Sequence, residues 1–126
     1  MQGGPGVGET SVLNPPGSSH RLQIADLELD LLRCRAYRNR QLLPLTPKEF
    51  GLLAFLMQRP GVVCVGWDLA EQVWKMKLHI HDRRNFKFHA VAIAMRRLRK
   101  KVDAGHGPKL LHTIRGGSYL LTDVSL

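Results

Sequence analysis

The sequence predicts an α+β domain with the layout of a winged helix-turn-helix. Three observations predict this fold: short alternating apolar segments near the N-terminus, three helix-like segments in the middle of the chain, and a glycine-rich hairpin pattern near its end. With 126 residues, the chain has the length of one domain and is long enough to bury a hydrophobic core. In a winged helix, the second and third helices form the helix-turn-helix, and the terminal hairpin is the wing.

The first twenty residues differ in composition from the rest of the chain. Residues 1–20 contain five Gly, three Pro and three Ser. Such a segment buries too little apolar surface to offset the entropy that ordering it would cost. We therefore expect a flexible linker over residues 1–20 and a folded domain over residues 21–124.

The two cysteines and the absence of targeting signals bear on location. Cys34 and Cys64 lie in apolar contexts without CxxC spacing, so we expect both to be buried small hydrophobic groups in a reducing compartment. No apolar stretch approaches the ~18–20 residues that a membrane-spanning helix needs. The N-terminus has neither the basic start nor the apolar run of a signal peptide. The sequence therefore predicts a cytoplasmic protein without a membrane partner.

Short apolar or alternating segments after residue 21 predict antiparallel strands. They lie at residues 22–24, 27–29, 36–37 and 41–45, and an irregular loop is the alternative for this part of the chain. Strand-like patterns return at residues 109–114 and 119–122, where a glycine-rich turn separates them. These last two segments predict a β-hairpin.

A capping box predicts the start of the first helix. Thr46 can cap a free backbone N–H, Pro47 suits the first helical position, and Glu49 can reach back to the N–H of Thr46. Apolar residues follow at helical spacing until Pro60 and Gly61 end the helix. A short strand or an extended connector is expected over residues 62–65.

The next two helices are predicted over residues 68–74 and 85–102. The second of these is the longest helix, and Gly and Pro residues within 103–108 stop it. Its apolar residues recur at steps of three and four and form one buried stripe. The stripe consists of Phe88, Val91, Met95, Leu98 and Val102, and the opposite side carries His89, Ala92, Arg96, Arg99 and Lys100.

Positive charge dominates the composition. Nineteen Lys and Arg against ten Asp and Glu give a net charge of +9 and a pI near 10.3, which is typical of small domains that bind a polyanion. Residues 75–101 hold ten of these cations and a single acid, Asp82, and five cations fall within residues 96–101. With no acid to balance them, such a helix fits the DNA major groove, where arginine reaches phosphates or the O6 and N7 of guanine. A solvated helix face is the alternative.

The tip of the predicted hairpin is a second candidate contact. Arg115 is followed by Gly116 and Gly117, and glycine permits a tight turn and a close approach to another backbone. An arginine at such a tip can enter the minor groove, where the potential is most negative. An ordinary exposed turn is the alternative, and His112 and Thr113 fit either a DNA contact or a plain strand role.

Four segments in a fixed order resemble a known family. They are residues 46–50 with Leu52 and Leu53, residues 69–74, residues 96–102, and residues 112–116 with Tyr119. Together they resemble the effector domain of OmpR/PhoB-type response regulators, and most of all its copper and heavy-metal branch, over about residues 20–124. The resemblance implies a four-stranded N-terminal antiparallel sheet, three helices and a C-terminal wing.

The resemblance also implies function. It implies sequence-specific binding to double-stranded promoter DNA, as the output domain of a two-component system, with a tandem homodimer on direct repeats and with the segment between the second and third helices facing RNA polymerase. Arg96, Arg97 and Arg99 match the family's groove and phosphate contacts, Arg115 its wing arginine, and Trp74 a packing residue. The candidate DNA-binding residues are His89, Ile93, Arg96, Arg97, Arg99, Lys100, Thr113, Arg115 and Gly116.

Three features depart from the family pattern. Ala92 stands where an acid is typical, and the segment over residues 75–84 is longer than usual and basic. Gly117 and Ser118 replace the usual pair before the tyrosine. No receiver domain with a phosphoacceptor aspartate precedes the domain, so we expect that this chain does not itself accept a phosphoryl group.

Other function classes find little support in the sequence. There is no P-loop, nucleophile elbow or HExxH motif, and the few carboxylates are scattered, so we expect neither an enzyme nor a cofactor. His79, His81 and His89 lack the Cys partners and the defined ligand spacing of a metal site, so we expect no metal site. The remaining alternative function is a nonspecific nucleic-acid-binding or basic protein-interaction module.

Overall fold

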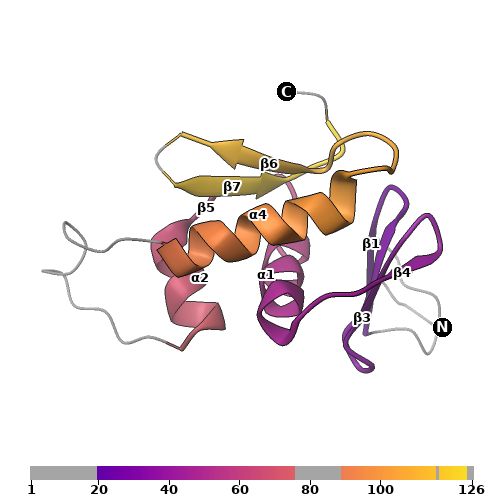
Figure 1. Ribbon diagram of the computed structural model, residues 1–126, viewed down its shortest axis with the longest axis horizontal. Helices are drawn as coiled ribbons and strands as arrows, with labels where there is room; N and C mark the ends of the chain where they lie inside the picture. Colours follow the sequence, from indigo (N-terminus) through magenta and orange to yellow (C-terminus); the bar gives the residue numbers. More distant parts are fainter. Residues whose placement is uncertain (1–19, 76–88, 116, 125–126) are drawn as a thin grey trace, which may run out of the picture.

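The computed structural model describes residues 20–75, 89–115 and 117–124. An N-terminal sheet lies at one end of the molecule, three described helices occupy the middle, and a hairpin runs beside the last helix (Figure 1). In chain order the elements are β1 (Arg21–Ile24), β2 (Leu27–Asp30), β3 (Arg35–Arg38), β4 (Gln41–Leu43), α1 (Pro47–Met57), β5 (Cys64–Val65), α2 (Gly66–Val73), α4 (His89–Asp103), β6 (Leu111–Ile114) and β7 (Ser118–Leu121).

The first four strands form an antiparallel sheet in the order β1-β2-β3-β4, which confirms the four-stranded N-terminal sheet. Leu29 pairs with Ala36 and Ala36 with Leu43, so one row of buried apolar residues crosses three strands on the face toward the core. Asn39 and Arg40 both have positive φ, 51° and 65°, which is the geometry of a two-residue type I′ turn between β3 and β4.

The predicted capping box begins α1. The Oγ1 of Thr46 accepts a hydrogen bond from the N–H of Glu49 at 3.2 Å, and Oε1 of Glu49 accepts one from the N–H of Thr46 at 3.0 Å. Helix α2 begins at Gly66, two residues before its predicted start, and no side chain caps it. The early start is explained by burial of Gly66 and Trp67, since their packing substitutes for the sequence signal of a cap.

The apolar stripe of α4 forms the centre of the core. Val91, Met95, Leu98 and Val102 are all buried, and α4 packs across both α1 and α2. The described helix begins at His89, so the predicted start at Asn85 and the stripe residue Phe88 lie outside the described residues.

The predicted hairpin is formed by β6 and β7. A short strand, β5, completes a three-stranded sheet in the order β5-β7-β6. The N–H of Gly66 donates to the carbonyl of Gly117 at 3.0 Å, which ties the start of α2 to the wing. Gly117 has a φ of 74°, a conformation that glycine adopts without strain.

The prediction that both cysteines are buried is wrong for Cys34. Cys64 is buried in the core, and this burial raises the pKa of its thiol. Cys34 is exposed, because it lies with a φ of 54° in the turn between β2 and β3, where the chain reverses at the surface. Within the described ranges, no helix has the length and apolar character needed to cross a bilayer.

Candidate nucleic-acid interface

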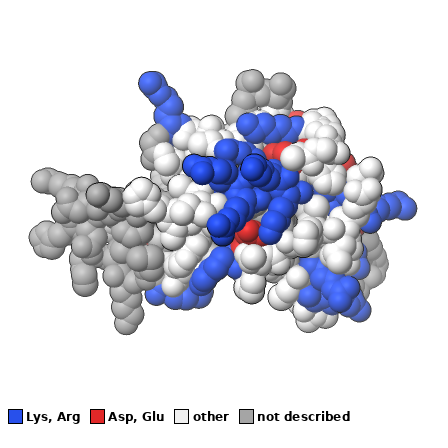
Figure 2. Space-filling view, in the orientation of Figure 1, with Lys and Arg blue, Asp and Glu red and all other residues white. Residues whose placement is uncertain are grey.

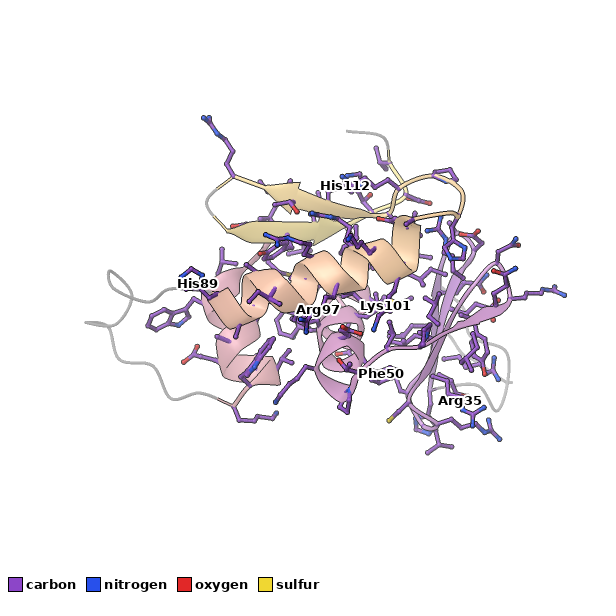
Figure 3. All side chains as sticks on the ribbon, in the orientation of Figure 1. Arg35, Phe50, His89, Arg97, Lys101 and His112 are labelled. Carbon is purple, nitrogen blue, oxygen red and sulfur yellow. The ribbon has the colours of Figure 1, made fainter. Side chains whose placement is uncertain are left out.

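One side of α4 carries an exposed stripe of candidate residues. His89, Ile93, Arg96, Arg97 and Lys100 recur at steps of three and four, so they share one face, and all are exposed. Figure 2 shows Lys and Arg side chains gathered over the middle of α4, and Figure 3 shows Arg97 on the same side of the helix. We call these five residues the α4 stripe. Its three cations form no ion pair with any acid in the part of the chain that the structure describes.

Arg99 has a different environment from the α4 stripe. It is half-buried, and its Nη1 donates a hydrogen bond to Oγ1 of the exposed Thr113 on β6. Thr113 pairs across the hairpin with Tyr119, which is buried. Burial raises the pKa of the Tyr119 hydroxyl, and the charge of Arg99 opposes the shift. Arg99 thus braces the wing against α4 while retaining further N–H donors.

Lys101 contradicts the expectation that no acid balances the basic run. Its Nζ lies 2.6 Å from Oε1 of Glu49 and 2.9 Å from the carbonyl oxygen of Pro44. Helical spacing places Lys101 on the flank of α4 that faces the first turn of α1, and the carboxylate stands there. Glu49 is 52 residues away in sequence, so the local charge pattern could not reveal the pair.

The carboxylate of Glu49 is held in its charged form. It is only 2% exposed, and this burial by itself raises the pKa of the carboxyl. The hydrogen bond and charge of Lys101, together with the hydrogen bonds to Thr46, outweigh burial and bring the pKa below its ordinary value.

The wing places two of its candidate residues on the surface. Arg115, directly after β6, is exposed and makes no hydrogen bond or ion pair with any described residue. Thr113 lies on the face of the hairpin toward Arg99. Side chains alternate along a strand, so His112 lies on the opposite face, where its Nε2 is buried without a partner among the described residues (Figure 3). Gly116 lies outside the described residues.

A buried arginine that the sequence analysis missed holds the end of α4. Arg38 is 0% exposed, and its Nη1 donates to the carbonyl of Val102 at 2.8 Å and to Oδ1 of Asp103 at 3.0 Å. Its Nη2 donates to the carbonyl of Pro108 at 2.6 Å, and its Nε to Oδ1 of Asp26 at 2.6 Å. Strand alternation gave a signal, because Arg38 shares the core face of β3 with the buried Ala36.

Asp103 extends this network into the wing. Its Oδ1 and Oδ2 accept the backbone N–H groups of Leu110 and Leu111 at 3.0 Å and 3.1 Å, just where β6 begins. Arg38 and Asp103 therefore connect the N-terminal sheet, the end of α4 and the first strand of the wing. The network fixes the position of the wing relative to the α4 stripe.

Metal ligands do not gather in the described part of the chain. No group of three or more His, Cys, Asp or Glu residues there could hold a metal ion. His79 and His81 lie outside the described residues, and His89 is exposed at the start of α4.

Comparison with known proteins gives a consistent result. The family described as "Transcriptional regulatory protein, C terminal" matches residues 39–121. The transcriptional activator protein IrlR of Burkholderia pseudomallei is 46% identical over 100 residues, which cover 79% of this chain and 41% of IrlR. The transcriptional regulatory protein CusR of Escherichia coli is 37% identical over 101 residues, which cover 80% of this chain and 42% of CusR. The chain thus spans about two fifths of the length of these relatives.

The fold matches a solved DNA-binding domain. The DNA-binding domain of CpxR from E. coli superposes with a TM-score of 0.67 at 32% identity. The match covers 82% of this chain and 97% of that structure. The similarity therefore extends over nearly the whole of a domain that has been solved as a separate unit.

Proposed function

The chain belongs to the family of C-terminal domains of transcriptional regulatory proteins, as the winged-helix effector domain of OmpR/PhoB-type response regulators, and from this premise we propose that it binds duplex DNA sequence-specifically to regulate transcription. The same relatives support the copper and heavy-metal branch that the motifs indicated. The family consists of transcriptional regulators, and the chain is not an enzyme. The observation that carries the proposal is the α4 stripe, whose cations are exposed beside the wing.

Helix α4 has the shape and charge to enter a major groove. Arg96 and Arg97 can each present a planar fork to guanine O6 and N7 or to a phosphate, and Lys100 offers a point charge to a phosphate. Ile93 provides an apolar contact for a thymine methyl group, and His89 a polar contact at the start of the helix. Arg99 acts in this proposal by holding Thr113 and the wing, and we propose that its remaining N–H donors contact the same duplex.

The wing completes the proposed interface. Arg115 extends from the end of β6 without a described partner, which suits insertion into a minor groove. Thr113 and Gly116 are proposed to contact the sugar-phosphate backbone nearby. Phosphate contacts of this kind fix the register of the protein on the duplex, whereas contacts from the α4 stripe to base edges read the sequence.

The proposal includes three features of the longer regulators. These are a linker over residues 1–20 before a DNA-binding domain over residues 21–124, a tandem homodimer on direct repeats, and contact with RNA polymerase by the segment between α2 and α4. The relatives' greater length supports a role as the output part of a larger two-component regulator. Affinity for duplexes with one and two half-sites would test the tandem arrangement.

A selection experiment tests the proposed function most directly. Duplexes bound by the protein are selected from a random pool, and binding is then measured on a selected duplex and on a scrambled one. We expect selected duplexes to share a motif and to bind at least ~10³-fold more tightly than the scrambled sequence. Failure to enrich any motif would favour the alternative of a nonspecific nucleic-acid-binding or basic protein-interaction module.

The Arg97→Ala variant tests whether Arg97 contacts a DNA base or a phosphate. Loss of a base contact costs about 1–3 kcal/mol on the selected duplex and little on the scrambled one. The matched control is Arg35→Ala, which removes a cation that is also exposed from β3, far from α4 (Figure 3). Equal losses of affinity on both duplexes would show that Arg97 contacts a phosphate. A loss of affinity in Arg35→Ala equal to that in Arg97→Ala would show that the effect is not specific to α4.

A further inference from the structure

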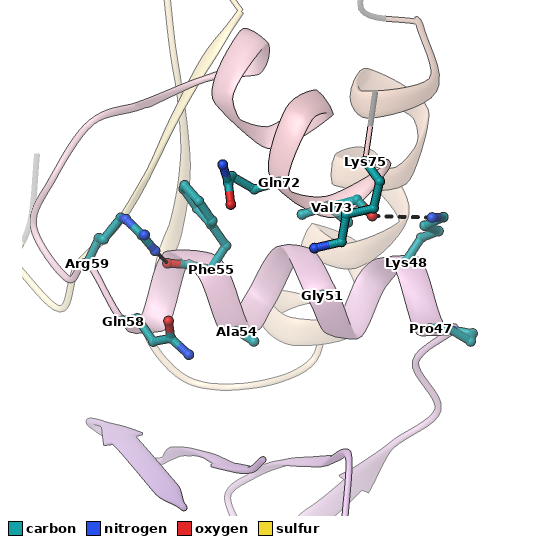
Figure 4. Close-up of a pocket in the computed structure, with 10 residues that line it drawn as sticks. All are labelled: Pro47, Lys48, Gly51, Ala54, Phe55, Gln58, Arg59, Gln72, Val73 and Lys75. Carbon is teal, nitrogen blue, oxygen red and sulfur yellow. Dashed lines mark hydrogen bonds between the residues drawn. The ribbon is translucent and has the colours of Figure 1, made fainter. Parts of the chain in front are cut away.

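A groove runs between the outer faces of α1 and α2. It has a volume of about 400 Å³ (Figure 4). The described residues that line it are Pro47, Lys48, Gly51, Ala54, Phe55, Gln58, Arg59, Gln72, Val73 and Lys75. Along α1 these residues lie opposite the buried Leu52, Leu53 and Leu56, so the groove faces away from the core. Helix α4 contributes no described lining residue.

The floor of the groove is apolar. It is formed by Ala54, Phe55 and Val73, which are half-buried against the core. Gly51 allows the two helices to approach closely, because a Cβ at this position would lie 3.1 Å from Cγ1 of Val73. The floor therefore offers an apolar strip between two helices, the type of surface on which a third helix packs.

Cations stand at both ends of this strip (Figure 4). At one end, the guanidinium of Arg59 lies 3.7 Å from the centroid of the Phe55 ring and donates to the Phe55 carbonyl at 3.0 Å. At the other end, Nζ of Lys48 donates to the carbonyl of Val73 at 3.2 Å and lies 5.5 Å from the centroid of the Trp74 ring. These contacts hold the cations in place without neutralising them.

The described residues that line the groove carry positive charge and no negative charge. Lys48, Arg59 and Lys75 are exposed, and among the described lining residues there is no Asp or Glu. None of the three cations forms an ion pair with a described acid. From Lys48 to Arg59 the helix rises about 16 Å, roughly three turns. A ligand that matches this surface has apolar side chains in the middle and negative charge at both ends.

We propose that this groove docks an acidic amphipathic helix of a partner protein. Apolar side chains at positions i, i+3 or i+4 and i+7 would cover Ala54, Phe55 and Val73. Carboxylates about three turns apart would face Arg59 at one end and Lys48 and Lys75 at the other. Because the α4 stripe is on a different face, a protein could occupy the groove while duplex DNA occupies α4.

An NMR titration of the whole chain tests the proposal. The probe is a synthetic amphipathic helical peptide with leucines at the stated spacing and glutamates at both ends, and its control has lysine in place of every glutamate. We expect saturable shifts of the amide signals of Gly51, Ala54, Phe55 and Gln72 with the glutamate peptide alone. Absence of saturable shifts, or equal binding of the lysine peptide, would overturn the proposal.

Variants locate the site. Arg59→Gln and Lys75→Asn each remove one cation, and asparagine suits the positive φ of 57° at residue 75. Each is expected to weaken peptide binding by about 1.5-fold to 5-fold, the range for exposed ion pairs, whereas the control Arg35→Gln leaves it unchanged. Thermal unfolding checks that each variant is folded.

Two further outcomes would contradict the proposal. Peptide-induced shifts confined to Arg96, Arg97 and Lys100 would show that the acidic peptide binds the α4 stripe instead. Shifts of Gly51 and Phe55 on addition of a DNA duplex would show that the groove binds nucleic acid. Neither result depends on whether the duplex has a preferred sequence, so the groove and the proposed DNA function are tested separately.

Discussion

Glu49 connects two helices through one carboxylate. It closes the capping box of α1 by accepting from the N–H of Thr46, and it pairs with Lys101 of α4. Removing the Glu49 carboxylate from water is costly, and the short charge-assisted hydrogen bonds offset that cost. The pair also takes Lys101 out of the set of cations available to a ligand.

Glu49→Gln is expected to lower the free energy of unfolding at pH 7 by about 2–4 kcal/mol, because it removes the counter-charge of Lys101. The folded-state pKa of Glu49 is below its ordinary value of 4.5, so its contribution is fully present above that value. It is lost as the pH falls through the folded-state pKa. Urea unfolding between pH 7 and pH 3 should therefore show the difference between wild type and variant shrinking with acidity.

A double-mutant cycle provides the control for this prediction. Lys101→Met alone and together with Glu49→Gln gives the coupling energy of the pair. Asp30 also titrates in acid, because the backbone N–H of Arg33, followed by the Arg33 side chain, lowers its pKa despite burial. Asp30 is present in every variant, so its effect cancels. A difference between wild type and Glu49→Gln that does not change with pH would contradict the assigned role.

Individual residues were predicted from the sequence where local spacing decides their position. Arg96 and Lys100 are exposed because they lie opposite the apolar stripe, and periodicity alone showed this, whereas Arg99, placed on the same side, is half-buried against the wing. The pairing of Lys101 and the buried position of Arg38 were missed, since both depend on residues brought together only by the fold. Cys34 was predicted to be buried because of its apolar neighbours in the sequence, but it lies in a turn at the surface.

At the level of elements, the end of α4 depends on a side chain from the N-terminal sheet. Arg38 donates to one backbone carbonyl in the last turn of α4 and to another in the connection to β6. Without Arg38 these carbonyls would lack hydrogen-bond donors. A buried carbonyl oxygen without a donor lowers the stability of the fold. The N-terminal sheet therefore contributes directly to the geometry of the proposed DNA-binding elements.

Arg38→Met is expected to destabilise the domain by about 3–5 kcal/mol, because it leaves the Asp103 carboxylate and two carbonyls without their guanidinium. Arg38→Lys keeps the charge but cannot reach all four acceptors, so a smaller loss is expected. The control Arg35→Met alters an exposed residue of the same strand and should change stability by less than about 0.5 kcal/mol. Urea unfolding measures the stability of all three variants. Wild-type stability of Arg38→Lys would show that the planar guanidinium group is not needed.

Most elements could be predicted because their signals are local. The capping box fixed the start of α1, and the glycines fixed the position of the hairpin turn. Strand β5 contains only Cys64 and Val65, since pairing with β7 rather than its own composition defines it. The start of α2 was missed for a similar reason, because tertiary burial replaces the cap there.

Across the whole molecule, described acids form ion pairs with some of the cations and leave others unpaired. Asp26, Asp30, Glu28, Glu49 and Asp103 all pair with arginine or lysine. The cations of the α4 stripe and Arg115 have no such partner in the described part of the chain. Among the described residues, unpaired positive charge thus gathers on the face that carries α4 and the wing (Figure 2).

This distribution predicts a steep salt dependence of DNA binding. Each of Arg96, Lys100 and Arg115 that neutralises one phosphate contributes roughly −0.9 to the slope of log K against log salt concentration. Changing such a phosphate contact to alanine should make the slope shallower by about 1, whereas loss of a base contact by Arg97 leaves the slope nearly unchanged. Fluorescence anisotropy over a series of salt concentrations measures the slope. An unchanged slope in all three variants of the phosphate contacts, or a shallower one in Arg35→Ala, would place the bound DNA elsewhere.

The composition indicated a polyanion ligand, and the order of motifs indicated the fold, but neither revealed the groove between α1 and α2. Its lining comes from two segments that each look like an ordinary amphipathic helix. The unbalanced charge at its ends becomes visible only when Arg59, Lys48 and Lys75 are placed on one surface. Features that combine the outer faces of separate helices lie beyond what periodicity can show.

The grip of Arg38 on the end of α4 has a practical consequence for dissecting this domain. A minimal fragment starting at Thr46 would retain every described helix and the hairpin, yet it would lack the guanidinium between the Val102 and Pro108 carbonyls. The carboxylate of Asp103 would lose its counter-charge while still bound to the start of β6. Excising the helix-turn-helix and wing from this protein would thus remove the clamp that aligns them.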